Sequence, residues 1–201
     1  MMFRITMITF LCALGALTTG CASTPKSRFY TLSATAAPVA TTSTLSVIVG
    51  PVSVPAVVDR PQIVVDMGAN QVRLEDFNRW AEPLQNNIAR VVADNLVQML
   101  GTPRVNLLAQ TSSTNSDYRA AVDVQSFQSA PGKAAMLDAI WTVRRTTDDK
   151  SKTGRTTVRE AIQQNGREKA YDALAAAHSR AVARLSQDIA DAVRAIEGSG
   201  K

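Results

Sequence analysis

Apolar residues recur at helical spacing in two long stretches of this chain. Within residues 80–100 they form one face, which consists of Leu84, Ile88, Val91, Val92, Leu96 and Met99. A second stripe consists of Leu174, His178, Ala181, Leu185, Ile189, Ala192 and Ile196. This spacing predicts two long amphipathic helices. Asn165, with Glu168 three positions later, resembles a capping box before the second helix, and Gly198 ends that helix.

Runs of β-branched residues and alternating segments predict the strands of the first half. The apolar residues of 44–54 and the run at 62–67 are typical of buried strands. Residues 68–70 predict a hairpin turn, and residues 71–76 then return as its second strand. A short strand is expected at 104–108, directly after the first helix.

Three alternating segments in the second half of the chain predict a meander. The residues expected to share its covered face are Tyr118, Ala120, Val122 and Val124, then Leu137, Ala139, Trp141 and Val143, then Val158 and Ile162. Arg155, Thr157 and Arg159 are expected on the opposite, solvated face. Together the elements predict an α/β fold, a single-domain sandwich in which a mixed, largely antiparallel sheet is packed by two long amphipathic helices.

Residues 1–20 have the organisation of a lipoprotein signal peptide. Arg4 supplies a positive charge, and an apolar core over residues 5–17 is followed by small residues. The sequence LTTGC, which ends at Cys21, resembles the bacterial lipobox, so Cys21 is the predicted attachment residue for acyl chains such as palmitate. Thr18 stands where lipoboxes usually carry leucine. An ordinary signal peptide or an uncleaved anchor is the alternative interpretation.

The segment after the signal peptide indicates both the membrane that holds the protein and a linker. Ala22 stands where an aspartate would favour retention at the inner membrane, so the rule for enteric-type bacteria favours the outer membrane. Residues 21–43 are rich in Ala, Ser, Thr and Pro and predict a lipidated tether, with a short strand at 28–33. The folded domain is then expected over residues 44–198.

The charge of the chain does not indicate a nucleic-acid partner. The formal net charge is +5 at pH 7, but the basic residues are dispersed among acidic ones. The densest basic run lies within residues 144–155 and includes Asp148 and Asp149, which is typical of a solvated turn. A periplasmic location also makes a nucleic-acid partner unexpected, so no nucleic acid is expected among the partners.

The sequence offers little for catalysis or metal binding. His178 is the only histidine and lies on an apolar stripe, which indicates a core or boundary residue more than a general base. Without residues 1–20 the chain keeps a single, acylated cysteine, so a zinc site lacks its usual ligands. No G-x-S-x-G, G-x-G-x-x-G or Walker pattern occurs. We therefore expect no catalytic residue, no metal, no cofactor and no enzymatic activity.

Two apolar features allow more than one interpretation. Trp80 precedes the first helix, where it either closes one end of the core, which is favoured, or contacts a partner. Residues 54–58 form an apolar loop that either folds against the core or faces another subunit or lipid. The pattern does not choose between the two placements of the loop.

Three motifs carry a resemblance to a known family. The segment VGPVSVPAVVDRPQIVV, residues 49–65, contains G-P-V, V-P and D-R-P-Q-I-V, and residues 79–84 read R-W-A-E-P-L. Tyr30 and Leu32 supply an aromatic Y-x-L near the mature N-terminus. With these motifs the chain resembles the ABC-type transport auxiliary lipoproteins, the PqiC-type components of MCE transport systems, over nearly the whole mature sequence.

The resemblance implies a non-catalytic, periplasm-facing lipoprotein that acylated Cys21 anchors in the outer membrane. Its implied partners are a periplasmic MCE-domain protein and a separate ABC permease and ATPase, which move lipids between the membranes and support membrane integrity. The lipoprotein would dock the MCE assembly at the outer membrane, and a homo-oligomer is compatible with its apolar loop. A direct lipid carrier and a structural envelope lipoprotein are the alternatives. The candidate contact residues are Pro55, Val57, Val58, Asp59, Arg60 and Trp80.

Overall fold

The computed structural model describes residues 25–108, 115–162 and 170–199 as one α/β domain. In chain order its elements are β1 Arg28–Tyr30, β2 Val47–Ser53, β3 Gln62–Gly68, β4 Gln71–Trp80, α2 Leu84–Leu100, β5 Val105–Leu107, β6 Tyr118–Ala130, β7 Ala134–Arg145, β8 Ser151–Ala161 and α3 Ala170–Gly198. The expected fold class is confirmed, with two long helices packed against mixed β-structure.

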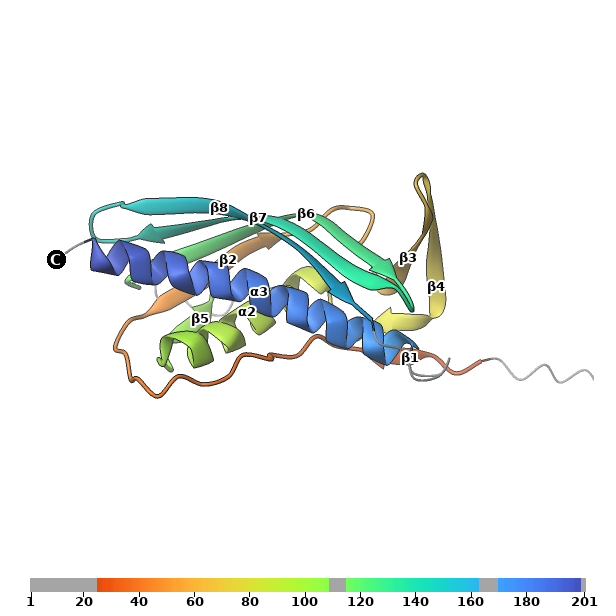
Figure 1. Cartoon of the computed structure of the whole chain (residues 1–201), viewed down its shortest axis with the longest axis horizontal. Helices are drawn as coiled ribbons and strands as arrows, with labels where there is room; N and C mark the ends of the chain where they lie inside the picture. The colour runs from red at the N-terminus through yellow and green to blue at the C-terminus, as the bar shows by residue number, and fades with distance from the viewer. Residues whose placement is uncertain (1–24, 109–114, 163–169, 200–201) are drawn as a thin grey trace, which may run out of the picture.

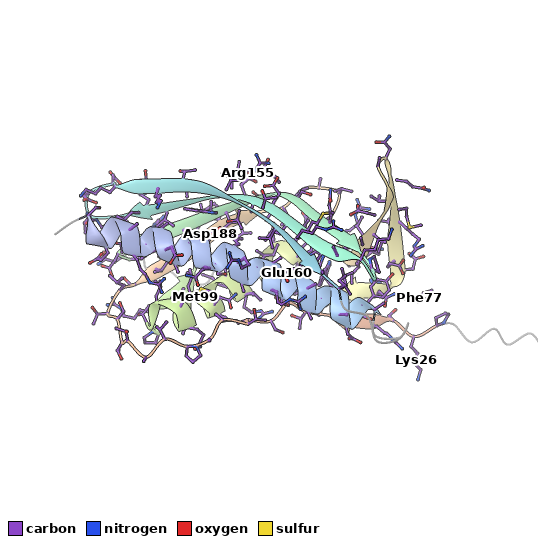
Figure 2. The ribbon with its side chains drawn as sticks, viewed as in Figure 1. Lys26, Phe77, Met99, Arg155, Glu160 and Asp188 are labelled. Carbon is purple, nitrogen blue, oxygen red and sulfur yellow. The ribbon has the colours of Figure 1, made fainter. Side chains whose placement is uncertain are left out.

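Five strands form the main sheet, in the order β5-β2-β6-β7-β8. Strand β2 lies parallel to both β5 and β6, whereas β6, β7 and β8 form the predicted antiparallel meander. The meander strands are longer than the alternating segments suggested, with 13 residues in β6 and 12 in β7. The side chains of Arg155, Thr157 and Arg159 are exposed on the solvated face, as expected, and Figure 2 shows Arg155 on the outer side of the sheet.

Both helices cover one face of the main sheet. Helix α3 extends along the meander, and α2 packs beside it next to β2 and β5 (Figure 1). Every residue of the two predicted apolar stripes is buried, and the stripes join the inward side chains of β2, β6 and β7 in one core. Burying each Val or Leu side chain contributes about 1.5–3 kcal/mol, so this layer dominates the stability of the domain.

A second, three-stranded sheet lies at one end of the domain, in the order β1-β4-β3. Strands β3 and β4 form the predicted hairpin, which projects beyond the main sheet (Figure 1). The expectation of one sheet is therefore refined to two. Alternation along a strand shows which side chains face water, but it does not show which strands are neighbours.

The first helix begins at Leu84, so the expected stretch of 80–100 starts about four residues too early. Trp80 instead ends β4, where it pairs with Tyr30 in the parallel β1–β4 ladder. Its N–H donates to the Pro61 carbonyl at 2.7 Å. Pro83 precedes the helix with ψ 131°, outside the helical region. Pairing with residues far away in the sequence therefore decides the structure of this segment.

Residues 31–43, which we call the strap, run extended along the helical layer (Figure 1). The N–H of Leu32 donates to Oδ1 of Asn87 on α2 at 3.1 Å. The N–H of Ser33 donates to Oγ of Ser179 on α3, also at 3.1 Å. The strap therefore bonds to both helices near their adjoining faces.

The strap corrects the expectation of a loose tether over residues 21–43, as far as that segment is described. The N–H groups of Thr35 and Ala36 both donate to Oδ1 of buried Asn95, at 3.1 and 3.0 Å. Composition predicted a linker, but buried amides on α2 supply acceptors that an isolated linker lacks. The short strand expected within 28–33 is confirmed as β1, which is three residues long.

Several predicted features fall outside the described residues. These are the signal segment 1–20, Cys21, Asn165 and Glu168. The lipid attachment and the capping box therefore stay predictions. No helix in the described ranges is long and apolar enough to cross a membrane.

Candidate functional site

The D-R-P-Q and R-W-A-E-P-L motifs meet on one side of the domain. The backbone N–H of Trp80 donates to the Pro61 carbonyl at 2.7 Å. Gln62 stands opposite Arg79 in the β3–β4 ladder. Strand pairing therefore places the two motifs side by side, although a complete hairpin separates them in the sequence.

The indole of Trp80 closes one end of the core. The side chain is buried and contacts Phe127 edge to face, with ring centroids 6.1 Å apart. It also meets the ring of His178, with centroids 6.2 Å apart. The core interpretation of Trp80 is confirmed, and its indole leaves little surface for a partner.

His178 lies in the core, as its place on the apolar stripe predicted. Its ring stacks on Phe127 with centroids 3.9 Å apart, and its Nε2 atom lies 2.9 Å from Oγ of buried Ser129. Burial lowers the pKa of His178 to about 3, so the imidazole is neutral at pH 7. Within the described residues Nδ1 has no hydrogen-bond partner. The pair therefore lacks the orienting carboxylate of a hydrolytic triad.

The apolar loop at 54–58 divides between the core and the surface. The N–H groups of Val58 and Asp59 both donate to the Pro55 carbonyl, at 3.0 and 3.1 Å, which closes a tight turn. The side chain of Val58 is buried, whereas that of Val57 is exposed. Val58 thus folds against the core, as one interpretation expected, whereas Val57 faces outward. Contact of Val57 with another subunit or with lipid stays a prediction.

Two hollows adjoin where the motifs meet, and Glu82 lines both. The smaller has a volume of about 290 Å³ and is lined by Asp59, Arg60, Pro61, Trp80, Ala81, Glu82 and Pro83. The larger, of about 400 Å³, is lined by Val49, Gly50, Pro51, Val52, Glu82, Gln85, Asn86, Ala89, Arg90, Leu107 and Leu108. We call the two hollows together the motif surface.

Gly50 shapes the floor of the larger hollow. Its φ of 125° is one that L side chains rarely adopt, and a Cβ atom on it would lie 3.1 Å from Cβ of Leu108. The β2–β6 register shifts between Val49 and Val52, where Pro51 has no N–H for the ladder. The G-P-V motif therefore marks an irregularity of β2 directly at the hollow.

Arg90 connects the motif surface to the strap. Its guanidinium lies 3.0 Å from the Glu82 carboxylate, and Nη2 also donates to the Leu32 carbonyl at 3.1 Å and to Oδ1 of Asn87 at 2.9 Å. Both charged side chains are about a third exposed, so the ion pair itself contributes roughly 0–1 kcal/mol. The same guanidinium joins Glu82, just before α2, to the backbone of the strap at Leu32.

The motif surface combines apolar side chains with charges of both signs. Val52, Leu107 and Leu108 supply apolar area, and Asp59 and Arg60 add charge beside it. The part of the chain that the structure describes holds no group of three or more His, Cys, Asp or Glu side chains suited to a metal ion. Apolar area with a polar rim is typical of protein recognition surfaces.

A third hollow, which we call the hairpin hollow, lies beside the β3–β4 hairpin. It has a volume of about 610 Å³, and hairpin residues such as Met67 and Val72 line it together with Phe127 of β6. The six candidate contact residues are therefore divided. Asp59, Arg60 and Trp80 line the motif surface, whereas Pro55, Val57 and Val58 line the hairpin hollow.

The sequence did not reveal the hairpin as a surface. The alternation at 71–76 is typical of a strand with one covered face, yet Val72 and Leu74 are both exposed. Glu82, Leu107 and Leu108 were also not singled out. The contribution of Leu107 and Leu108 depends on β5 lying parallel to β2, a pairing between segments more than 50 positions apart.

The basic run within 144–155 is a solvated turn, as predicted. Arg145 pairs with Asp148 at 2.6 Å, and Arg144 pairs with Asp149 at 3.2 Å. Lys150 lies 3.8 Å from the Asp148 carboxylate. Two local carboxylates therefore compensate most of the positive charge of the β7–β8 connection.

Comparison with known proteins connects this architecture to a family. The family model described as the ABC-type transport auxiliary lipoprotein component matches residues 30–190. No curated protein sequence matches the chain. The crystal structure of a DUF330-family protein from Xanthomonas campestris aligns with a TM-score of 0.67 and 17% identity, covering 87% of this chain and 100% of that one.

A second crystal structure, of an uncharacterized protein, aligns with a TM-score of 0.65 and 18% identity, covering 84% of this chain and 99% of that one. These two likenesses show the fold. A PelC dodecamer from Paraburkholderia phytofirmans aligns with a TM-score of 0.38, which is too low to indicate a shared assembly. The family match, in contrast, covers most of the chain, including the strap and the motif surface. The chain therefore belongs to the family of ABC-type transport auxiliary lipoprotein components.

Proposed function

We propose that this chain is the non-catalytic outer-membrane lipoprotein subunit of an MCE-type, ABC-driven lipid transport system. Acylated Cys21 would hold the domain on the periplasmic side of the outer membrane. The domain would dock the end of a periplasmic MCE assembly there, while a separate permease and ATPase supply the energy. The proposal refines the family's description as an auxiliary lipoprotein component of ABC-type transport.

The meeting of two motifs at the motif surface carries the proposal. D-R-P-Q and R-W-A-E-P-L supply much of the resemblance to the family, and their residues form the walls of the smaller hollow. The exposed Asp59 and the partly exposed Glu82 keep charge at its rim. Leu108 and Val52 add apolar area in the adjoining hollow. A partner with an apolar centre and a polar rim would complement this surface.

Partner purification tests the docking role. The tagged, acylated chain is extracted from membranes in a mild detergent, and the proteins that co-purify are identified by mass spectrometry. We expect an MCE-domain protein together with ABC permease subunits. Recovery of the chain without any MCE or ABC component would contradict the proposed function.

A matched pair of variants tests whether the motif surface makes the contact. Leu108→Asp places a charge on the motif surface at a side chain that is 36% exposed, and Ile140→Asp places the same charge on β7 at 37% exposure. We expect Leu108→Asp to reduce the co-purified MCE protein about tenfold, which corresponds to ~1.4 kcal/mol of binding free energy. Ile140→Asp should leave the recovery unchanged. Equal recovery from both variants would exclude the motif surface as the contact.

A further inference from the structure

Exposed apolar side chains gather at one end of the described molecule. Six of the nine large apolar side chains that are exposed among the described residues belong to β1, to the hairpin and to the adjoining loop. They are Phe29, Val57, Met67, Val72, Leu74 and Phe77. A concentration of exposed apolar side chains in one region of a folded domain indicates an interaction site.

The N-terminal segment leaves the domain at this same end. Figure 2 shows Lys26 and Phe77 at one extremity of the molecule, and Figure 1 shows the hairpin projecting there. From Arg28 onward the chain is held by β1 and then by the strap. Only six residues of the sequence therefore separate Cys21 from the start of β1 at Arg28.

The distance that the chain can span between Cys21 and Arg28 is comparable with the length of the hairpin. Cys21 precedes Arg28 by seven positions, which span at most about 25 Å when fully extended. Strand β3, with seven residues, is itself about 23 Å long. A lipid anchor at Cys21 would thus keep the membrane surface within reach of the hairpin end.

The charges on the hairpin favour an apolar contact over an electrostatic one. The Arg73 guanidinium lies 2.7 Å from the Glu75 carboxylate, so this pair is internally compensated. Exposed Asp76 adds a negative charge to the hairpin, which does not attract anionic headgroups. Lys26 is exposed near the point where the chain leaves the domain, where a cation would favour anionic headgroups. Phe29 is 64% exposed, and an aromatic ring of this kind is suited to the interface between headgroups and acyl chains.

We propose that the hairpin end, defined by Phe29, Met67, Val72, Leu74 and Phe77, contacts the lipid surface of the membrane that holds the Cys21 anchor. The inference rests on the proposed function in taking Cys21 as acylated. The contact fixes the orientation of the domain on the membrane, so that the motif surface is held at a defined angle to the bilayer. The lipoprotein then acts as an oriented platform for its partner.

Depth-dependent quenching tests this contact on the full, acylated chain. Leu74→Cys provides a thiol for an environment-sensitive fluorophore, and Ile140→Cys is the matched control, with exposures of 41% and 37%. Each labelled protein is reconstituted into vesicles of phosphatidylethanolamine and phosphatidylglycerol that contain a spin-labelled lipid. We expect the label at position 74 to be quenched about threefold more strongly than the label at position 140. A second label, at Val72→Cys, should repeat the result if one variant folds poorly.

The outcomes separate this inference from the proposed function. Intact mass reports acylation of Cys21 independently of quenching. An acylated chain with equal quenching at positions 74 and 140 overturns the membrane contact alone. An unmodified Cys21 overturns the anchor and the membrane contact together. If unlabelled Leu74→Cys protein forms disulfide-linked dimers on vesicles while the labelled protein is not quenched, a second copy occupies the surface, which also overturns the inference.

Discussion

The N–H of Leu32 donates a hydrogen bond at 3.1 Å to the side-chain oxygen of Asn87, a residue 55 positions further along the chain. Asn87 is fully buried, and so is Asn95 two helical turns later, which accepts from the next part of the strap. The two asparagines occur within the apolar face of α2, where an unpaired side-chain oxygen would be costly. Their role is to bind backbone that composition alone assigns to a tether.

Asn95→Ala should release the strap from α2. The substitution removes the acceptor of two N–H groups, those of Thr35 and Ala36, and also the donor to Oγ of Ser186. We expect the free energy of unfolding to fall by about 1–3 kcal/mol, because partly buried groups lose their partners. Urea unfolding measures the loss, and limited proteolysis should show earlier cleavage within residues 31–43.

Asp94→Ala is the control for this substitution. Asp94 neighbours Asn95 in sequence but is exposed and makes one ion pair, 3.4 Å from Arg90. Its removal should change stability by no more than about 0.5 kcal/mol. If both variants were equally stable and equally resistant to protease, the strap would not depend on Asn95.

The stability of the domain should decrease as the pH is lowered, because of His178. Burial lowers the pKa of this histidine to about 3 in the folded state, whereas it is about 6.5 in an unfolded chain. Below pH ~6.5 the unfolded state therefore binds a proton that the folded state excludes, so stability is lost as the pH decreases. Between pH ~6.5 and pH ~5 we expect a loss of about 2 kcal/mol in the free energy of unfolding.

His178→Gln identifies the source of that dependence. Glutamine does not titrate, and its amide can still form a hydrogen bond with the hydroxyl of Ser129. In the wild type this hydroxyl lies 2.9 Å from Nε2 of His178. The variant should be less stable at neutral pH because it loses the ring stacked on Phe127. Its stability should nevertheless be nearly flat over the same pH range. A slope equal to that of the wild type would assign the dependence to other groups.

Gly154→Ala should disturb the β7–β8 pair. A Cβ atom at this position would lie 2.2 Å from Cζ2 of Trp141, the residue opposite it in the ladder. The indole must move, although its Nε1 donates to Thr156 at 3.0 Å. We expect a loss of about 1–3 kcal/mol in the free energy of unfolding. Gly68→Ala, where a Cβ atom would meet nothing within 4 Å, should cost less than about 0.5 kcal/mol.

Cys21→Ser should abolish membrane attachment without affecting the fold. The serine hydroxyl does not receive the thioether-linked lipid, so labelled palmitate should be absent and the protein should leave the membrane fraction. Circular dichroism and thermal unfolding of the domain should match those of the wild type, since the described fold begins several residues later. Incorporation of palmitate into the serine variant would show that Cys21 is not the attachment residue.

Spacing along the chain determined the features that depend on residues only a few positions apart. The stripes that begin at Leu84 and Leu174 bury one face of each helix, and the alternation from Tyr118 to Val143 lies on adjacent strands as predicted. These periods follow from local backbone geometry, which is the same in every helix and strand. The motifs at 49–65 and 79–84 were also visible as sequence, and the family match agrees with them.

Only the tertiary structure decided how distant segments meet. Trp80 ends a strand rather than beginning a helix because Tyr30 and Pro61 lie beside it. The strap is bound because buried Asn87 and Asn95 face it, and the hairpin is exposed because no element covers its side chains at Val72 and Leu74 within the described fold. Each outcome depends on contacts between residues tens of positions apart. Local spacing carries no information about such contacts, because they are made only when the whole domain closes around its core.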